Sequence, residues 1–107
     1  MTNAELRDYL LATLRPLGVR VRPMFGGYGL WLGDRYFGII HGGQAWFRTD
    51  AESRAHYLER GMPAFQPPNR PRGPRTVDRT FPVPEEILAD VGQLTEWALR
   101  AAACERE

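Results

Sequence analysis

The chain has 107 residues with a formal net charge of +1, and 43% of the residues are hydrophobic. This length and composition predict one domain, residues 1–107, with one modest core, and they exclude a wholly disordered chain. No apolar run approaches the roughly 20 residues that cross a bilayer, so we expect no membrane partner.

The first predicted element is an amphipathic helix over residues 3–15. Thr2 and Glu5 form the pattern of a capping box, in which each side chain accepts from the backbone N–H of the other residue. Pro16 and Gly18 end the helix. The segment carries acids and lacks the basic-then-apolar pattern of an export signal, so we expect a cytoplasmic protein. The apolar face, spaced at the helical period, consists of Leu6, Tyr9, Leu10, Leu14 and Leu17.

Residues 19–49 are predicted to form an antiparallel meander. Two valines alternate with two arginines over residues 19–22, which is typical of a strand with one apolar face. Short glycine-containing turns at 33–34 and 42–43 separate the following segments, whereas parallel pairs need a much longer crossover. The three following segments are residues 28–32, 36–40 and 44–49.

A glycine-rich stretch follows the first of these strands, with Gly26, Gly27 and Gly29 close together. A loop that cradles phosphate has such glycines between a strand and the N-terminus of a helix. Here another strand follows, so the favoured interpretation is a bend or bulge that lets Met24 and Phe25 turn into the core. A phosphate loop is the alternative.

A second helix is predicted over residues 51–60, with Ala51, Ala55 and Leu58 on its apolar face. Five prolines within residues 62–74 exclude a regular helix there and predict an exposed loop of partly extended character.

The chain then returns to a strand over residues 75–83. A helical region over residues 84–104 begins at Pro84 and is divided near Gly92. The order is helix, three or four strands, helix, one or two strands, helix. It predicts an α+β fold, a two-layer antiparallel sheet of about five strands with helices mainly on one face.

No arrangement of residues predicts catalysis or a metal site. Cys104 is the one cysteine, and His41 and His56 stand far apart, whereas a structural metal site takes about four such ligands. We expect Cys104 to be a structural thiol and both histidines to be surface groups. We expect no cofactor.

Four arginines lie within ten residues of the second half. A solvated loop is the favoured interpretation, and a phosphate-binding strip for a small molecule or nucleic acid is the alternative. The case for nucleic acid is weak, because no exposed aromatic residue is interleaved with these arginines and the net charge is only +1. The four are Arg70, Arg72, Arg75 and Arg79.

Trp31 and Trp46 indicate large apolar groups on both faces of the sheet. Trp31 points opposite to Leu30, and Trp46 points opposite to Phe47, whereas a sheet with one wet face alternates apolar with polar residues. Helices on one face would leave the other for a homodimer or a ligand. The alternative is that residues 62–74 cover this second face.

The segment Arg22–Leu30 reads R-P-M-F-G-G-Y-G-L and resembles the opening of the TfoX N-terminal domain family. Further segments match that family in order, so the resemblance covers about residues 20–102. At Thr80 and Phe81 the chain departs from a tyrosine pair that the family usually carries. The family-motif residues are Met24, Phe25, Gly26, Gly27 and Gly29, and the further segments are 46–50, 61–65, 80–84 and 94–98.

The resemblance implies a regulatory role, because the named members of the family regulate natural competence together with the cyclic-AMP receptor protein. Those regulators carry a second, helical C-terminal domain, so we expect this chain to be a stand-alone first domain. The function that we expect is a non-enzymatic binding module, a transcription co-regulator that acts through protein contacts. The alternative is a small-molecule or nucleic-acid phosphate binder that uses residues 70–79.

Overall fold

A computed structural model describes residues 1–24, 26–59, 61 and 80–104. It has a five-stranded antiparallel sheet whose strands follow one another in chain order, which confirms the predicted α+β fold. The strands are β1 Val19–Met24, β2 Gly27–Leu32, β3 Arg35–His41, β4 Gln44–Arg48 and β5 Thr80–Pro82. Short connections join β1 to β2, β2 to β3 and β3 to β4, whereas the chain passes through the helix α2, Ala51–Glu59, before it reaches β5 beside β4.

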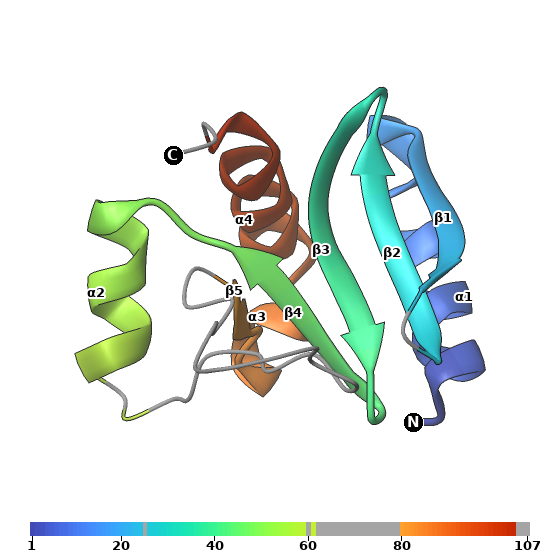
Figure 1. Ribbon diagram of the computed structural model, residues 1–107, viewed down its shortest axis with the longest axis horizontal. Coiled ribbons are helices and arrows are strands. Elements are labelled where there is room, and N and C mark those ends of the chain that lie inside the picture. Colours follow the sequence, from blue (N-terminus) through green and yellow to red (C-terminus); the bar gives the residue numbers. More distant parts are fainter. Residues whose placement is uncertain (25, 60, 62–79, 105–107) are drawn as a thin grey trace, which may run out of the picture.

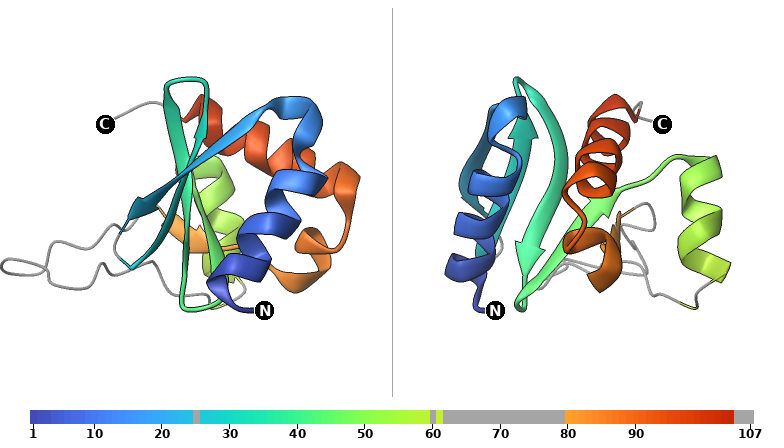
Figure 2. Two further views of the ribbon diagram at one scale, coloured as in Figure 1. Left: turned by 90° about the vertical axis from the view of Figure 1, so that its right-hand side faces the viewer. Right: turned by 180° about the vertical axis from the view of Figure 1, so that it is seen from behind.

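The helices form the second layer of the fold. Figure 2 shows α1 and the pair α3 and α4 on one side of the sheet, and Figure 1 shows α2 beyond the end of β4. Tyr57 joins α2 to the rest, because its ring stacks on Phe81 at 5.3 Å and meets Trp97 edge-on at 5.2 Å. The helical elements are α1 Asn3–Thr13, a 3-10 turn Arg15–Leu17, α2 Ala51–Glu59, α3 Glu85–Leu88 and α4 Val91–Ala103.

The first helix begins where predicted and ends at Thr13, two residues before the predicted end. The Thr2 hydroxyl accepts from the N–H of Glu5 at 3.1 Å, and the Glu5 carboxylate accepts from the N–H of Thr2 at 2.9 Å, so the capping box is confirmed. After α1 the chain continues through the 3-10 turn and then reverses at Gly18, whose φ of 71° lies in the left-handed region that glycine tolerates.

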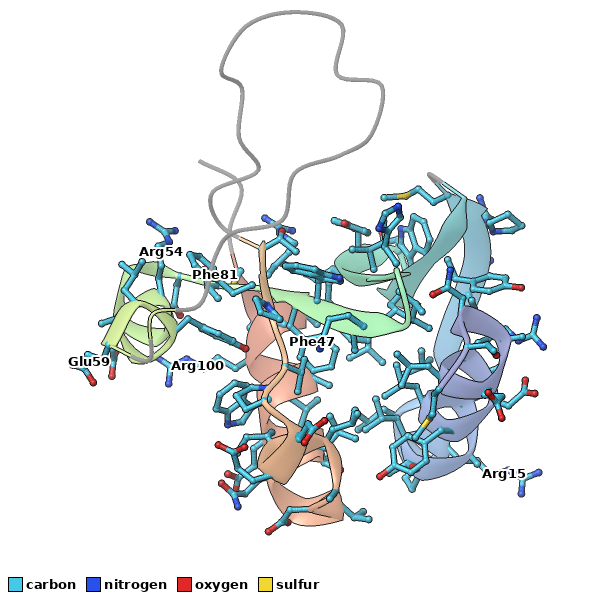
Figure 3. The ribbon with its side chains drawn as sticks, turned by 90° about the horizontal axis from the view of Figure 1, so that it is seen from below. Arg15, Phe47, Arg54, Glu59, Phe81 and Arg100 are labelled. Carbon is cyan, nitrogen blue, oxygen red and sulfur yellow. The ribbon has the colours of Figure 1, made fainter. Side chains whose placement is uncertain are left out.

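The core lies between the sheet and the three helices α1, α3 and α4. Alternation along the strands sends one set of side chains into this layer, where Figure 3 shows Phe47 between β4 and the helices. The sheet and helix side chains of the core cluster include Leu6, Leu10, Leu14, Leu30, Phe37, Ile40, Phe47, Val83, Ile87, Leu94, Ala98 and Ala101.

The buried side of α2 differs from the sequence expectation. In α2, Leu58 is 59% exposed and Ala55 is exposed, so these two do not form the predicted apolar face, and Tyr57 is the buried residue among the described side chains of this helix. An aromatic ring reaches Phe81 and Trp97 across a gap that shorter side chains do not span.

The division of the last helical region lies before Gly92, not at it. The first piece, α3, ends at Leu88, and Asp90 caps α4, with its carboxylate accepting from the N–H of Gln93 at 3.0 Å. A carboxylate at the N-cap sets a helix start more strongly than a glycine inside the first turn does. Residues 62–79, which include most of the predicted strand 75–83 and the proline-rich loop, lie outside the described residues.

Candidate functional site

The open face is the name used here for the side of the sheet opposite α1, α3 and α4. Residues that pair directly across antiparallel strands lie on the same face. Arg20 pairs with Trp31, Trp31 with Tyr36, and Ile39 with Trp46. The open face therefore gathers aromatic and arginine side chains and one isoleucine from four strands, namely Arg20, Arg22, Trp31, Tyr36, Ile39, Trp46 and Arg48.

Trp31 lies flat against the sheet because its neighbour on the same face is a glycine. A Cβ atom on Gly29 would come within 2.5 Å of Cζ3 and 2.6 Å of Cη2 of the Trp31 indole. The same Cβ would approach the Met24 sulfur at 3.0 Å, so Met24 lies on the open face. The expectation that Met24 turns into the core is wrong. Successive side chains of a strand point to opposite faces, so Met24 lies on the face of Arg20 and Arg22 and opposite to Val21.

An arginine also lies over the Trp31 indole. The guanidinium carbon of Arg22 lies 5.9 Å from the ring centroid, within the range of a cation–π interaction. The Tyr36 ring is tilted by 59° against the indole with a centroid separation of 5.4 Å. Trp31 is thus held by three neighbours and remains partly exposed.

A groove of about 210 Å³ opens beside this indole. It lies at the end of the sheet where β2 turns into β3 and is bordered by β1. One acidic residue, Asp34, stands at the turn against two arginines of β1. The lining residues are Arg20, Arg22, Trp31, Gly33 and Asp34.

The far part of the open face is tied to the backbone by hydrogen bonds. Trp46 donates from Nε1 to the carbonyl of His41 at 3.2 Å, and Arg48 donates from Nη1 to the carbonyl of Tyr36 at 3.1 Å. Burial raises the pKa of the Tyr36 phenol to about 12, and the nearby Arg48 charge opposes this shift only in part. Tyr36 is therefore a neutral hydrogen-bonding group at physiological pH.

The glycine-rich stretch makes a tight connection between two strands. Gly26 has a φ of 79° and turns the chain from β1 into β2. A Cβ on Gly27 would overlap the carbonyl oxygen of Ile40, so close backbone approach requires glycine there. No helix follows, and the strand interpretation is confirmed over the phosphate-loop alternative. Phe25 lies outside the described residues.

The remaining candidates fall into two groups. Cys104 is buried, and desolvation, helped by the nearby Asp50 charge, raises the pKa of its thiol, which donates to the carbonyl of Arg100 at 3.4 Å. Residues 70–79, with all four predicted arginines, lie outside the described residues.

Within the described part of the chain, no three His, Cys, Asp or Glu side chains gather into a metal-binding group. Over the same residues, every helix is too short or too polar to cross a bilayer.

Sequence reasoning found Trp31 and Trp46 but missed the groove. The alternation of Arg20 and Arg22 with valines was visible, and it predicted a charged face of β1. Only the strand register places these arginines beside Trp31 and Tyr36. The bulge between β2 and β3 at Leu30 and Trp31, which sets that register, has no sequence signal.

Comparison with known families identifies one match. A family model, the TfoX N-terminal domain, matches residues 10–104 of this chain. The match includes all five strands and the helices α2, α3 and α4. No curated protein matches the chain.

Proposed function

We propose that this chain, which belongs to the TfoX N-terminal domain family, is a non-enzymatic regulatory module that binds a protein partner through the open face. The regulatory role that we propose is in transcription, as the resemblance to the family leads us to expect. The open face supplies the surface for it, because the helix layer occupies the opposite side of the sheet.

The composition of the open face is the observation that carries this proposal. Tryptophan, tyrosine and arginine are the residue types that dominate the energetics of protein–protein interfaces. Three aromatic and three arginine side chains of these types lie together there, on strands that pair with one another. The arginines supply charge, and the rings supply apolar area at little cost in side-chain entropy.

The exposed apolar residues elsewhere do not form a comparable surface. The most exposed large ones among the described residues come from the N-terminus and from three different helices. Scattered apolar residues are ordinary on a soluble protein and need no partner. They are Met1, Leu11, Leu58, Val91 and Leu99.

Co-purification from the native cell tests the proposal, followed by titration of the identified protein with the purified domain. We expect Trp31→Ala and Trp46→Ala to weaken this binding by more than tenfold, the effect of losing an interface hot spot. Leu99→Ala, on the outer side of α4 and 48% exposed, is the matched control and should bind normally. Equal binding by all three variants would place the interface elsewhere.

The open face also motivates the second candidate, a homodimer. Its aromatic residues are partly exposed, and pairing identical patches about a two-fold axis is the commonest way to bury such a surface. Sedimentation at micromolar concentration should then give twice the 12.2 kDa mass of the chain. Trp46→Arg should yield monomers, because it places an unpaired charge in the seam. A wild-type mass near 12.2 kDa would exclude the dimer and leave two candidates to cover the face, another protein or residues 62–74, which lie outside the described residues.

A further inference from the structure

Among the described residues, Arg20 and Arg22 have no carboxylate partner. Both project from the open face of β1, and β1 is an edge strand of the sheet in the described part of the chain. Across the described residues, no hydrogen bond or ion pair joins either guanidinium to another side chain. Arg22 instead makes a cation–π contact with the Trp31 ring. By contrast, Arg100 is paired with Asp50 at 3.5 Å and Glu52 at 3.3 Å.

The groove that these arginines line therefore carries an excess of positive charge. Among the described residues of the lining, Asp34 is the one acid, so two positive charges face one negative charge in a hollow of about 210 Å³. The Trp31 ring holds Arg22 over the sheet, which reduces the side-chain entropy that a salt bridge to this arginine would cost. An anionic ligand is the chemistry that complements this arrangement.

The spacing of the two arginines favours an extended acidic peptide. Residues two apart on one strand face are about 7 Å apart, since a strand rises about 3.4 Å per residue. An extended peptide lying beside β1 repeats its own side chains at the same interval. Carboxylates at alternate positions of such a peptide would face Arg20 and Arg22 together, as opposite charges do across neighbouring strands.

A nucleic acid fits the same groove less well. Proteins hold single strands by stacking bases on open aromatic faces. The Trp31 indole already lies against Gly29 and has the Arg22 guanidinium over its ring. A base would have to displace the arginine that is also needed to hold its phosphate.

We infer that the groove between Arg20, Arg22 and Trp31 binds an extended acidic segment of a partner protein, with carboxylates at alternate positions. This inference rests on the proposed function and specifies the chemistry of the partner. The guanidinium groups bind the carboxylates, and Trp31 positions Arg22.

Fluorescence anisotropy with a labelled peptide in which glutamate alternates with threonine tests the inference, with intrinsic tryptophan fluorescence as a second readout. Arg20→Gln and Arg22→Gln should each weaken binding about fivefold, the upper range for a cross-strand charge pair. The matched control is Arg15→Gln, which removes the same charge from the helix layer. Figure 3 shows Arg15 projecting away from the sheet, and this variant should bind within twofold of the wild type.

Three results would overturn the inference. The first is equal weakening by Arg15→Gln, which would indicate attraction to overall charge. The second is equally tight binding of a peptide with the same composition whose glutamates form one block. The third is tighter binding of a labelled oligothymidylate of equal charge, which would assign the groove to nucleic acid.

The inference and the proposed function fail in distinguishable ways. If the identified partner depends on Trp31 and Trp46 but is insensitive to Arg20→Gln and Arg22→Gln, the acidic-segment inference is wrong and the proposed function stands. If the partner is insensitive to all four substitutions, the proposed function is wrong as well. Circular dichroism of each variant confirms that the fold is retained.

Discussion

The two faces of this sheet are made by the same strands and yet are covered in different ways. On the helix face, Leu30 and Phe47 are at most 1% exposed because the apolar sides of α1 and α4 pack against them. On the open face, Arg22 lies over the Trp31 ring, and the aromatic side chains stay partly exposed. Arginine can cover apolar surface with its stem and keep its charge in water. The comparison shows that a two-sided sheet need not have helices on both sides.

The largest expected effect is on stability, and it is seen by comparing substitutions at two neighbouring residues of β4 that point to opposite faces. Phe47→Ala should lower the free energy of unfolding by about 3–5 kcal/mol, the range for an aromatic side chain lost from a packed core. Trp46→Ala should cost about half as much, because its side chain is partly exposed and its removal leaves little cavity. Urea denaturation monitored by circular dichroism measures both. Equal losses would mean that the two faces are equally packed.

The next effect concerns the backbone on which the open face rests. Gly27→Ala should destabilise the protein by more than about 3 kcal/mol, because the new Cβ overlaps the rigid carbonyl of Ile40. Gly29→Ala should cost about 1–3 kcal/mol, because the Trp31 ring can turn away from the new methyl group. Tryptophan emission should shift to longer wavelength in the Gly29 variant. If Gly29→Ala costs more than Gly27→Ala, the Trp31 ring is fixed in place and does not turn away from the new methyl group.

A smaller effect is confined to the helix layer. Thr2→Ala removes the hydroxyl that caps α1 and should cost about 1 kcal/mol. The control is Thr95→Ala, which removes a hydroxyl bonded to the Val91 carbonyl within α4 and should change stability by less than about 0.5 kcal/mol. Quenching of Trp31 by acrylamide should be the same in both variants. A changed quenching rate would show that the two layers are coupled through α1.

The smallest effect is a pH dependence on the open face. Burial raises the pKa of the Tyr36 phenol to about 12, so the folded state holds this proton more tightly than the unfolded chain does. The associated stability is present below the unfolded pKa of about 10 and is lost as the pH rises toward 12. Unfolding measured from about pH 9 to pH 10.5 should show the beginning of this loss. Tyr36→Phe should flatten it, and an unchanged slope in that variant would assign the titration to another group.

Local signals in the sequence predicted most of the elements. The capping box at Thr2 and Glu5, the glycine turns at 33–34 and 42–43, and the alternation of Trp46 with Phe47 each depend on residues within one or two turns. The prediction of the buried side of α2 was wrong because that side is set by contacts with Phe81 and Trp97, which are distant in sequence from Tyr57. The prediction for Met24 was wrong because the alternation of side chains between the two faces continues to Met24, the last residue of β1.

The sequence by itself determined the order of elements, the antiparallel meander and the residue types that make up the open face, because helical and strand periodicities and turn chemistry are local properties. The tertiary structure decided which of those residues meet. Arg22 reaches Trp31 and Trp31 reaches Tyr36 through strand register and one bulge, which depend on how whole strands pack against α1 and α4. The groove beside Trp31 therefore exists only in the folded sheet, where side chains from separate strands share one face.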